Sequence, residues 1–315
     1  MDYPFVTVPP SLGDRAEQLS FIRAWEKKFD DALDEMSHAI SRACVEEGVQ
    51  VIRLSGPTCA GKTTTAAKLT QELQEVGCTV YPISLDDFFY GRDELNERAA
   101  EDGSIDYDSV NALDLSALEG TLHGLLRRGM ADVPIYDFMK GDRVGYRTLD
   151  VRNIPGGRPV FLLEGIQAVY PEVIAHLKDI PDRSIFSTVA EGLCIGDRLF
   201  APHEIRLMRR LVRDEAKRNS TPAFSLYLWH SVRANEEACI LPYADACDYR
   251  VNSLMGFDVH MLAPRLKDIF ARHPVPADSP DFAAAMAQLA KLEGIEGISA
   301  DLIAPNSLYH EFIMI

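Results

Sequence analysis

An eight-residue stretch in the first fifth of the chain has the spacing of a phosphate-binding loop. It matches the Walker A pattern GxxxxGK[ST] with the residues Gly56, Pro57, Thr58, Cys59, Ala60, Gly61, Lys62 and Thr63. Glycines let backbone N–H groups turn inward around phosphate oxygens, and the positive end of the following helix adds a favourable field. The lysine of this pattern reaches the β- and γ-phosphates, and its last hydroxyl binds Mg²⁺. We therefore expect a site for a nucleoside triphosphate, in the simplest case ATP, together with Mg²⁺.

The surroundings of this loop make the match more specific. An apolar, strand-like segment (Val49 to Gly56) precedes it, and residues 63–76 have helical spacing, which is the context that the motif requires. We include Thr64 among the nucleotide contacts and expect Cys59 to contribute its backbone amide rather than a reactive thiol. The alternative is a turn that binds no ligand.

Acidic residues stand at the ends of two further strand-like segments. Asp86 follows the segment Cys78 to Leu85, and Glu164 closes the segment Arg158 to Gly165. In an open parallel sheet the carboxyl ends of the strands converge on the ligand crevice. Phosphoryl transfer needs carboxylates near the metal and near the attacking hydroxyl. We expect Asp86 and Glu164 to supply them, the alternatives being a turn cap and a loop charge.

A third group of candidate residues is a basic stretch in an otherwise acidic chain, made of Arg206, Arg209, Arg210, Arg213, Lys217 and Arg218. Arginines three and four residues apart share one face of a helix. A movable helix of this kind is expected to close over the phosphates, exclude water and neutralise the charge that develops during transfer. The alternative is a solvated helix face paired with acidic neighbours.

The elements that must position these residues alternate between strands and helices. We predict strands at Val49–Gly56, Cys78–Leu85, Arg158–Gly165, Arg183–Ala190 and Cys247–Ser253. Helices are predicted at 63–76, Leu113–Arg128, Ile205–Lys217, Pro222–Cys239 with Thr221 as N-cap, Val259–Arg272 and Asp281–Leu292. Strands separated by helices indicate an α/β fold with a parallel sheet covered on both faces.

Residues from Asp14 to about Glu47 form a separate amphipathic pattern. Apolar residues recur three and four positions apart, at Leu19, Ile22, Trp25, Phe29, Leu33, Met36 and Ile40. This spacing predicts a helix with one apolar stripe. Packing within its own domain and self-association into a homo-oligomer would both use such a stripe.

Composition restricts the partners of the protein. The chain has 315 residues, a formal net charge of −16 and 47% hydrophobic residues, so it can bury a sizeable core. Nucleic acids and anionic membranes both attract basic surfaces, so neither is expected as a partner, and a small-molecule substrate fits better. The six cysteines form no CxxC pair, and there is no leader-like start and no apolar run of about 18 residues. We expect a soluble cytoplasmic protein with reduced thiols.

Several motifs, taken in order, resemble a known family. They are GPTCAGKTT, LDDFFY, IDYDSVNALD, VPIYDF, LLEGIQAVY and RLMRRLVRDEAKR. In order and spacing they are similar to the uridine–cytidine kinases of the phosphoribulokinase/uridine kinase family, and the chain looks still more like a bacterial branch of uridine kinase-like proteins. The resemblance covers roughly Gln50 to the C-terminus. It implies a P-loop NTPase-type sheet, an arginine-rich lid helix and a small substrate-binding insertion.

The resemblance also implies roles for matching positions on the phosphate side. Asp86 matches the catalytic base and metal-linked aspartate, and Glu164 matches the metal-site glutamate. Arg210 matches a lid arginine near the acceptor. Arg213 and Arg218 match arginines that grip the triphosphate. Together with Lys62 and Thr63, these residues form the expected catalytic and metal set.

On the acceptor side, Asp108 matches the aspartate that holds the ribose hydroxyls of a nucleoside. Tyr136 and Phe138 match aromatic residues that line the nucleoside pocket, although by themselves these residues are interpreted as core aromatics. Three departures follow. Gly141 replaces a histidine that reads the pyrimidine, Ser220 replaces a further lid arginine, and the DHPD box of the family reads DSVN at 108–111.

Three functions remain open at this stage. The first is a nucleoside 5′-kinase for uridine, cytidine or a relative, and the second is a kinase for another alcohol, such as a sugar, a sugar phosphate or a pantothenate-like compound. The third is a nucleotide-sensing module without turnover, which the presence of Asp86 and Glu164 disfavours. We divide the chain into a helical extension (1–48), a kinase domain (49–273, lid near 203–220) and a C-terminal helix and tail (274–315) packed on it.

Overall fold

A five-stranded parallel sheet forms the centre of the computed structural model, which describes residues 3–98, 106–154 and 159–314. The strands lie in the order β10 (Tyr249–Asn252), β7 (Asp182–Thr188), β2 (Val51–Ser55), β6 (Pro159–Glu164) and β3 (Thr79–Ser84). All four pairings are parallel. The predicted strands and the predicted fold class are therefore confirmed, although Arg158, the expected start of one strand, lies outside the described residues.

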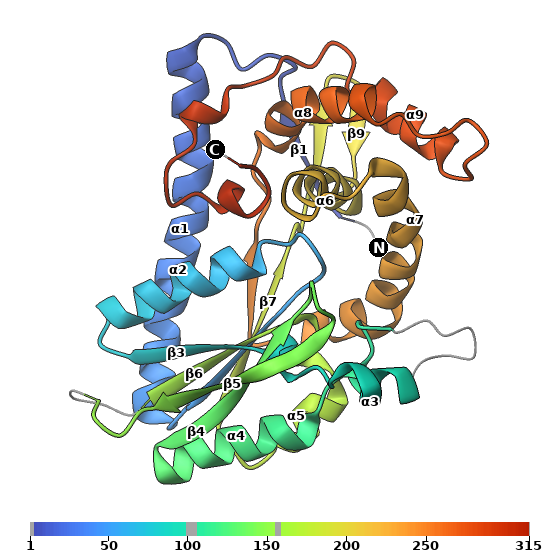
Figure 1. Cartoon of the computed structure of the whole chain (residues 1–315). Helices are drawn as coiled ribbons and strands as arrows, with labels where there is room; N and C mark the ends of the chain where they lie inside the picture. Colours follow the sequence, from blue (N-terminus) through green and yellow to red (C-terminus); the bar gives the residue numbers. More distant parts are fainter. Residues whose placement is uncertain (1–2, 99–105, 155–158, 315) are drawn as a thin grey trace.

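Both faces of this sheet are buried, because successive residues of a strand point to opposite sides. In β6, Val160 and Leu162 join one hydrophobic cluster, whereas Phe161 and Leu163 join the other. The first cluster is covered by α1 (Arg15–Glu46), α2 (Lys62–Glu75), α6 (Pro202–Arg218) and α8 (Asp258–Arg272). The second is covered by α4 (Leu115–Arg128) and α5 (Pro171–Leu177). Figure 1 shows α1 running along the length of the molecule.

The N-terminal segment is built into this core. Asp14 caps α1 by accepting the backbone N–H groups of Ala16 and Glu17, at 2.8 and 3.0 Å, which satisfies donors that the first helical turn leaves free. The apolar stripe of α1 is buried within its own chain, where Phe29 and Leu33 join the first cluster. Ahead of it, β1 (Phe5–Val8) pairs in parallel with β8 (Gly192–Ile195), and β9 (Arg198–Phe200) completes a small second sheet. This sheet was not predicted.

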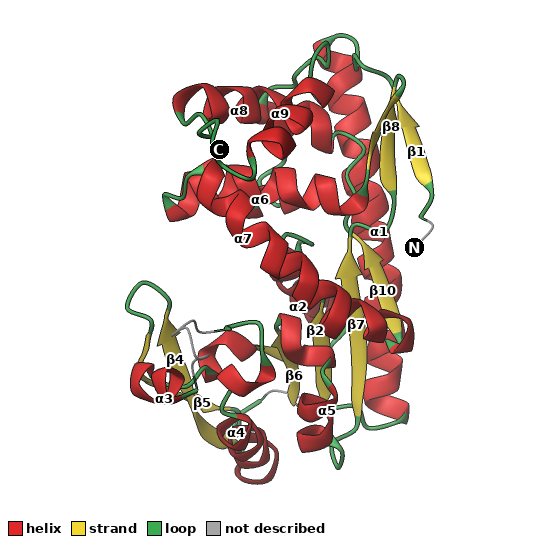
Figure 2. Ribbon diagram, turned by 90° about the vertical axis from the view of Figure 1, so that its right-hand side faces the viewer, coloured by secondary structure: helices red, strands yellow, loops and turns green. Residues whose placement is uncertain are grey.

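A β-hairpin forms an insertion beside the main sheet. Its strands β4 (Met130–Asp137) and β5 (Asp142–Asp150) are antiparallel, and α3 (Arg92–Glu97) lies near its turn. In Figure 2 the hairpin and α4 lie on one side of the molecule, whereas α6, α8 and α9 (Phe282–Lys291) lie on the other, with α7 (Pro222–Asn235) leading away from that group. Sequence patterns identified the motif VPIYDF but not the strand that contains it.

The helices that follow the small sheet agree with the prediction, with one difference. Thr221 caps α7 as expected, accepting the N–H of Phe224 at 3.3 Å. The predicted helix to Cys239 changes after Asn235 into a π-helical turn at Glu236–Ile240. Such turns redirect side chains and often occur at functional sites. Among the residues that the structure describes, no helix is long and apolar enough to cross a membrane.

Candidate active site

The backbone of the phosphate-binding loop has the conformation that its sequence predicts. Gly61 has φ +78° and precedes α2, and Cys59 also adopts a positive φ, +56°. A side chain at Gly56 would place Cβ 1.9 Å from the carbonyl oxygen of Ser187, so only glycine fits there. Lys62 donates from Nζ to the carbonyl oxygen of Pro57 at 3.1 Å, curled over its own loop.

Three side chains from outside the loop hold its carbonyl groups. Arg206 donates to the oxygen of Thr58 at 3.0 Å, and Arg209 donates to that of Cys59 at 3.3 Å. The hydroxyl of Ser187 donates to the oxygen of Ala60 at 2.9 Å. These three hydrogen bonds hold the backbone of the loop in place.

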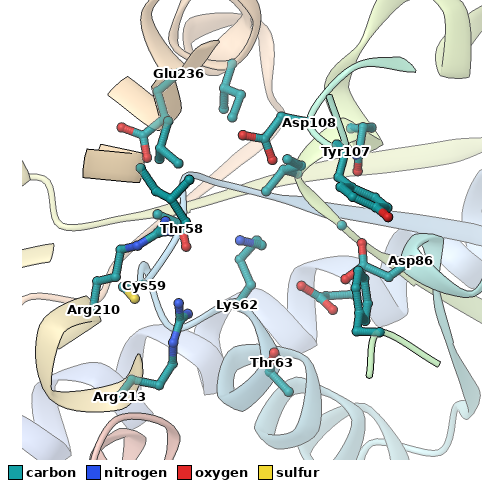
Figure 3. A pocket seen from close by; sticks show the side chains of 18 of the residues that line it. Thr58, Cys59, Lys62, Thr63, Asp86, Tyr107, Asp108, Arg210, Arg213 and Glu236 are labelled. Carbon is teal, nitrogen blue, oxygen red and sulfur yellow. Dashed lines mark hydrogen bonds between the residues drawn. The ribbon is translucent and has the colours of Figure 1, made fainter. Parts of the chain in front are cut away.

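A cavity of about 460 Å³ opens at this loop (Figure 3). Its walls come from the loop, the strand ends, the hairpin turn, α6 and α7. The predicted residues that line it are Thr58, Cys59, Lys62, Thr63, Asp86, Asp108, Phe138, Glu164, Arg210, Arg213 and Arg218. Thr64 lines a neighbouring cavity instead, and Tyr136 lines neither. The tertiary structure thus gathers most of the predicted set in one place.

The two predicted carboxylates lie near Lys62 and near each other. Asp86 stands in a short 3₁₀ turn whose start is capped by the Ser84 hydroxyl, which accepts the Asp86 N–H at 3.2 Å. Burial raises the pKa of Asp86, and the charge of Lys62 partly opposes the shift. Burial also raises the pKa of Glu164 to about 7. Burial therefore favours the protonated form of both carboxyl groups, and a nearby cation would favour the charged form.

The arginines of α6 divide into two pairs with different surroundings. Arg206 forms a buried ion pair with Glu236 at 2.5 Å, and Arg209 forms one with Asp258 at 2.7 Å. The interpretation of α6 as a solvated face is therefore wrong, although acidic partners are present. Because these pairs are desolvated, breaking either one would be costly. A lid motion of α6 would have to preserve them.

The second pair of arginines faces the cavity. Arg210 lies 3.2 Å from Asp214, and Arg213 donates to the same carboxylate at 2.7 Å. Figure 3 shows both arginines on one side of Lys62, with Asp86 on the other. Arg218 also lines the cavity, and its side chain is more exposed. Three arginines of α6 therefore bring positive charge to the cavity.

The other end of the cavity is acidic and aromatic. Asp106 and Asp108 line it together with Tyr107, Phe89 and Phe138. Burial, together with the charge of the nearby Asp106, raises the pKa of Asp108 to about 6. The ring of Phe138 is exposed and lies 5.7 Å from that of Phe89.

Tyr136 has a supporting position behind this end of the cavity. It is buried, and its ring lies 5.1 Å from that of Phe138 and 5.4 Å from that of Phe89. Gly141, in the hairpin turn, adopts φ +61°. A Cβ atom there would lie 3.9 Å from the Tyr107 hydroxyl and 3.7 Å from Nη2 of Arg92. A side chain at this position would thus face the acidic and aromatic end.

The cavity also contains residues to which no role was assigned from the sequence, and three of them carry polar side chains from distant parts of the chain. Glu236 and Gln167 are buried, and Glu311 reaches the loop from the C-terminal tail. The Gln167 amide donates from Nε2 to the carbonyl oxygen of Tyr107 at 3.0 Å, and its Oε1 finds no partner among the described residues. Gln167 lies within the motif LLEGIQAVY, but no role was assigned to it there. Asp106 likewise stands two positions before Asp108, in the stretch IDYD.

Comparison with known proteins identifies the family of this chain. A model of the Phosphoribulokinase / Uridine kinase family matches residues 51–260. The chain is 30% identical over 151 residues to the uridine kinase of Schizosaccharomyces pombe, which covers 48% of this chain and 31% of that protein. It is 26% identical over 181 residues to the uridine kinase of Ureaplasma parvum, covering 58% of this chain and 76% of that protein. The phosphoribulokinase structure from Rhodobacter spheroides matches with a TM-score of 0.42 and 16% identity, covering 64% of this chain and 68% of that one.

Proposed function

The chain belongs to the phosphoribulokinase/uridine kinase family, and from this membership we propose that it transfers the γ-phosphate of ATP to an alcohol group of a small molecule. The acceptor we propose is a neutral nucleoside, with uridine and cytidine as first candidates. One observation carries the proposal: Lys62, Asp86, Glu164 and Asp108 all line one cavity. Such a cavity brings a phosphate cradle, metal ligands, a base and a hydroxyl-binding group together.

The residues present suit ATP with Mg²⁺. Thr63, Asp86 and Glu164 line the cavity and offer the hard oxygen ligands that Mg²⁺ prefers. Within the described residues no cluster of three or more His, Cys, Asp or Glu side chains could hold a metal by itself. Mg²⁺ in phosphotransferases does not need one, since phosphate oxygens and water complete its shell. When bound, it neutralises charge on the β- and γ-phosphates.

The chain's own residues then have separate tasks in the transfer. Lys62 and the loop N–H groups hold the phosphates, and Arg210 and Arg213 face the charge that develops on the transferred group. Asp86 accepts the proton of the acceptor hydroxyl as its oxygen attacks the γ-phosphorus in line. A new O–P bond forms, the bond from the γ-phosphorus to the bridging oxygen breaks, and ADP leaves with the electron pair.

The charge distribution favours a neutral acceptor. The acceptor end is lined by the carboxylates Asp106 and Asp108, and the charges of Arg210 and Lys62 offset the raised pKa of Asp108 only in part. A sugar phosphate or a pantothenate-like acid would place its anion beside these two carboxylates. Like charges at such short range disfavour binding. We therefore expect a neutral acceptor to bind more tightly than an anionic one.

Among neutral acceptors, the aromatic end favours a nucleoside. Phe138 and Phe89 offer ring faces to a base, and Asp108 can accept hydrogen bonds from ribose hydroxyls. The free Oε1 of buried Gln167 provides another acceptor for a hydroxyl donor. The second candidate is a neutral sugar, which Gly141 favours because no side chain at that position reads a base.

The test is ADP release by purified protein with Mg²⁺ and ATP, against nucleosides, neutral sugars, sugar phosphates and pantothenate, with an acceptor-free control. Stimulation by uridine or cytidine supports the nucleoside. Stimulation by a neutral sugar alone retains the transfer mechanism and moves the acceptor to the second candidate. ADP release that no acceptor increases contradicts the proposal.

A further inference from the structure

A second cavity, of about 490 Å³, adjoins the phosphate loop on the side away from the acceptor. It shares Thr63 and Glu311 with the first cavity. One wall is the face of α2 that carries Thr64, Ala67 and Gln71, and the opposite wall is the C-terminal segment 305–311. A volume of this size is within the range of small-molecule sites.

The C-terminal wall is fixed to the phosphate loop. The side chain of Leu308 lies so close to Gly61 that a Cβ there would be 2.4 Å from Leu308 Cδ1. Buried Tyr309 donates its hydroxyl to Asp258, the partner of Arg209, which in turn holds the carbonyl oxygen of Cys59. Loop and tail are therefore joined by one buried polar network, and the cavity between them has rigid sides.

Glu311 occupies the junction of the two cavities. Its Oε2 accepts the backbone N–H of Thr64 at 3.3 Å and the Thr64 hydroxyl at 3.2 Å. Lys217 holds the backbone of the same residue, donating to its carbonyl oxygen at 3.0 Å. The first N–H groups of the helix after a phosphate loop bind phosphate oxygens in other proteins. The Glu311 carboxylate therefore occupies a position that a phosphate group would take.

We propose that segment 305–311 forms the nucleoside half of the phosphoryl-donor site, and that Glu311 occupies the place of a donor phosphate until the nucleotide displaces it. The proposal rests on the proposed function, since it adds a base-and-ribose subsite to the same triphosphate. The amides of Gln71 and Asn306, on opposite walls, can each donate to and accept from a base edge. The segment lies outside residues 51–260, the part of the chain that the family model matches.

The first test fills the cavity. Gln71→Trp places a large ring in it, whereas Gln74→Trp, on the same helix, lies outside it and serves as the matched control. Affinities are measured by calorimetry for Mg-ATP and for Mg-tripolyphosphate, which has no nucleoside. We expect Gln71→Trp to weaken ATP binding by about tenfold or more, equivalent to about 1.4 kcal/mol, and to leave tripolyphosphate unchanged. Unchanged ATP binding, equal losses for both ligands, or the same loss in Gln74→Trp would overturn the subsite.

The second test removes the charge of the tail. Glu311→Gln should tighten the binding of both ATP and tripolyphosphate severalfold, because neither then has to displace a carboxylate from Thr64. Glu296→Gln, which lies ahead of segment 305–311 in the C-terminal tail and lines neither cavity, should change neither affinity. Weaker or equal binding in Glu311→Gln would overturn the displacement.

Wild-type protein separates this inference from the proposed function. If it binds neither ATP nor tripolyphosphate, the proposed function fails and the subsite fails with it. If both ligands bind and Gln71→Trp affects neither, the subsite alone is wrong.

Discussion

Arg209 donates from Nη1 to the carbonyl oxygen of Cys59 at 3.3 Å, although its guanidinium is completely buried and cannot meet a substrate. The same guanidinium is paired with Asp258 through two hydrogen bonds, at 2.8 and 2.7 Å. A charged side chain that looks catalytic in the sequence therefore serves to shape the phosphate loop. The next residue along the chain, Arg210, lines the cavity.

Replacement of Arg209 tests this structural role. Arg209→Met leaves Asp258 charged and buried without its partner, which typically costs about 3–5 kcal/mol of the free energy of unfolding. Urea unfolding measures the loss. The matched control is Arg272→Met, which removes an exposed ion pair with Glu215 and should change stability little. Equal effects of the two substitutions would contradict the role of Arg209.

Asp86→Asn should abolish turnover and spare nucleotide binding. Loss of a general base typically lowers the rate by about 10²–10⁴-fold, and the amide keeps the shape of the carboxylate. The neighbouring Asp87 is the control, because it turns to the hairpin, where it accepts the N–H of Tyr136 and pairs with Arg147, each at 3.5 Å. We expect Asp87→Asn to retain most of the rate. Near-normal turnover by Asp86→Asn would show that another group is the base.

Lys62→Ala should weaken ATP binding and lower the rate together. Lys62 is the lysine of the loop motif, and its ammonium lies in the cavity between the arginines and Asp86 (Figure 3). Removing a charge-assisted contact to phosphate affects the ground state as well as the transition state. Calorimetry with ATP and steady-state kinetics measure the two effects. If ATP affinity is unchanged, the phosphate cradle is misassigned.

Acceptor binding should weaken as the pH falls through about 6. Burial raises the pKa of Asp108 to about 6, so its carboxylate is charged above this value and protonated below it. Only the charged form accepts hydrogen bonds strongly from two hydroxyls. The acceptor KM should therefore rise between pH 7.5 and pH 5, and in Asp108→Asn it should be high at every pH. A profile in Asp108→Asn identical to that of the wild type would exclude this residue from the acceptor site.

Gln167→Leu should raise the KM of the acceptor and leave that of ATP unchanged. The amide is buried at the cavity, its Nε2 is held by Tyr107, and Oε1 has no partner among the described residues. If the acceptor hydroxyl supplies that partner, its loss costs on the order of tenfold in kcat/KM. A parallel rise of both KM values would indicate that Gln167 only supports the wall.

The strands that the sequence predicted are those with recognisable residue patterns. The five central strands are short segments rich in β-branched and aromatic residues and separated by helical patterns, so composition and length identify them without any knowledge of partners. Strands β1, β8 and β9 have four, four and three residues, too few for a period to be recognised. Strand β5 is largely exposed, and its pairing with β4 depends on a turn at Gly141 that carried no recognised hairpin signal.

The sequence by itself determined the phosphate loop, the strand-end carboxylates and the charge of α6, because each depends only on residues that are neighbours in the chain. Only the tertiary structure decided which arginine is structural and which faces the cavity. Helical spacing puts Arg206, Arg209, Arg210 and Arg213 close together, but the partners Glu236 and Asp258 lie 30 and 49 residues away. Glu311 reaches Thr64 across 247 residues. Such contacts depend on how the helices pack, which no local pattern encodes.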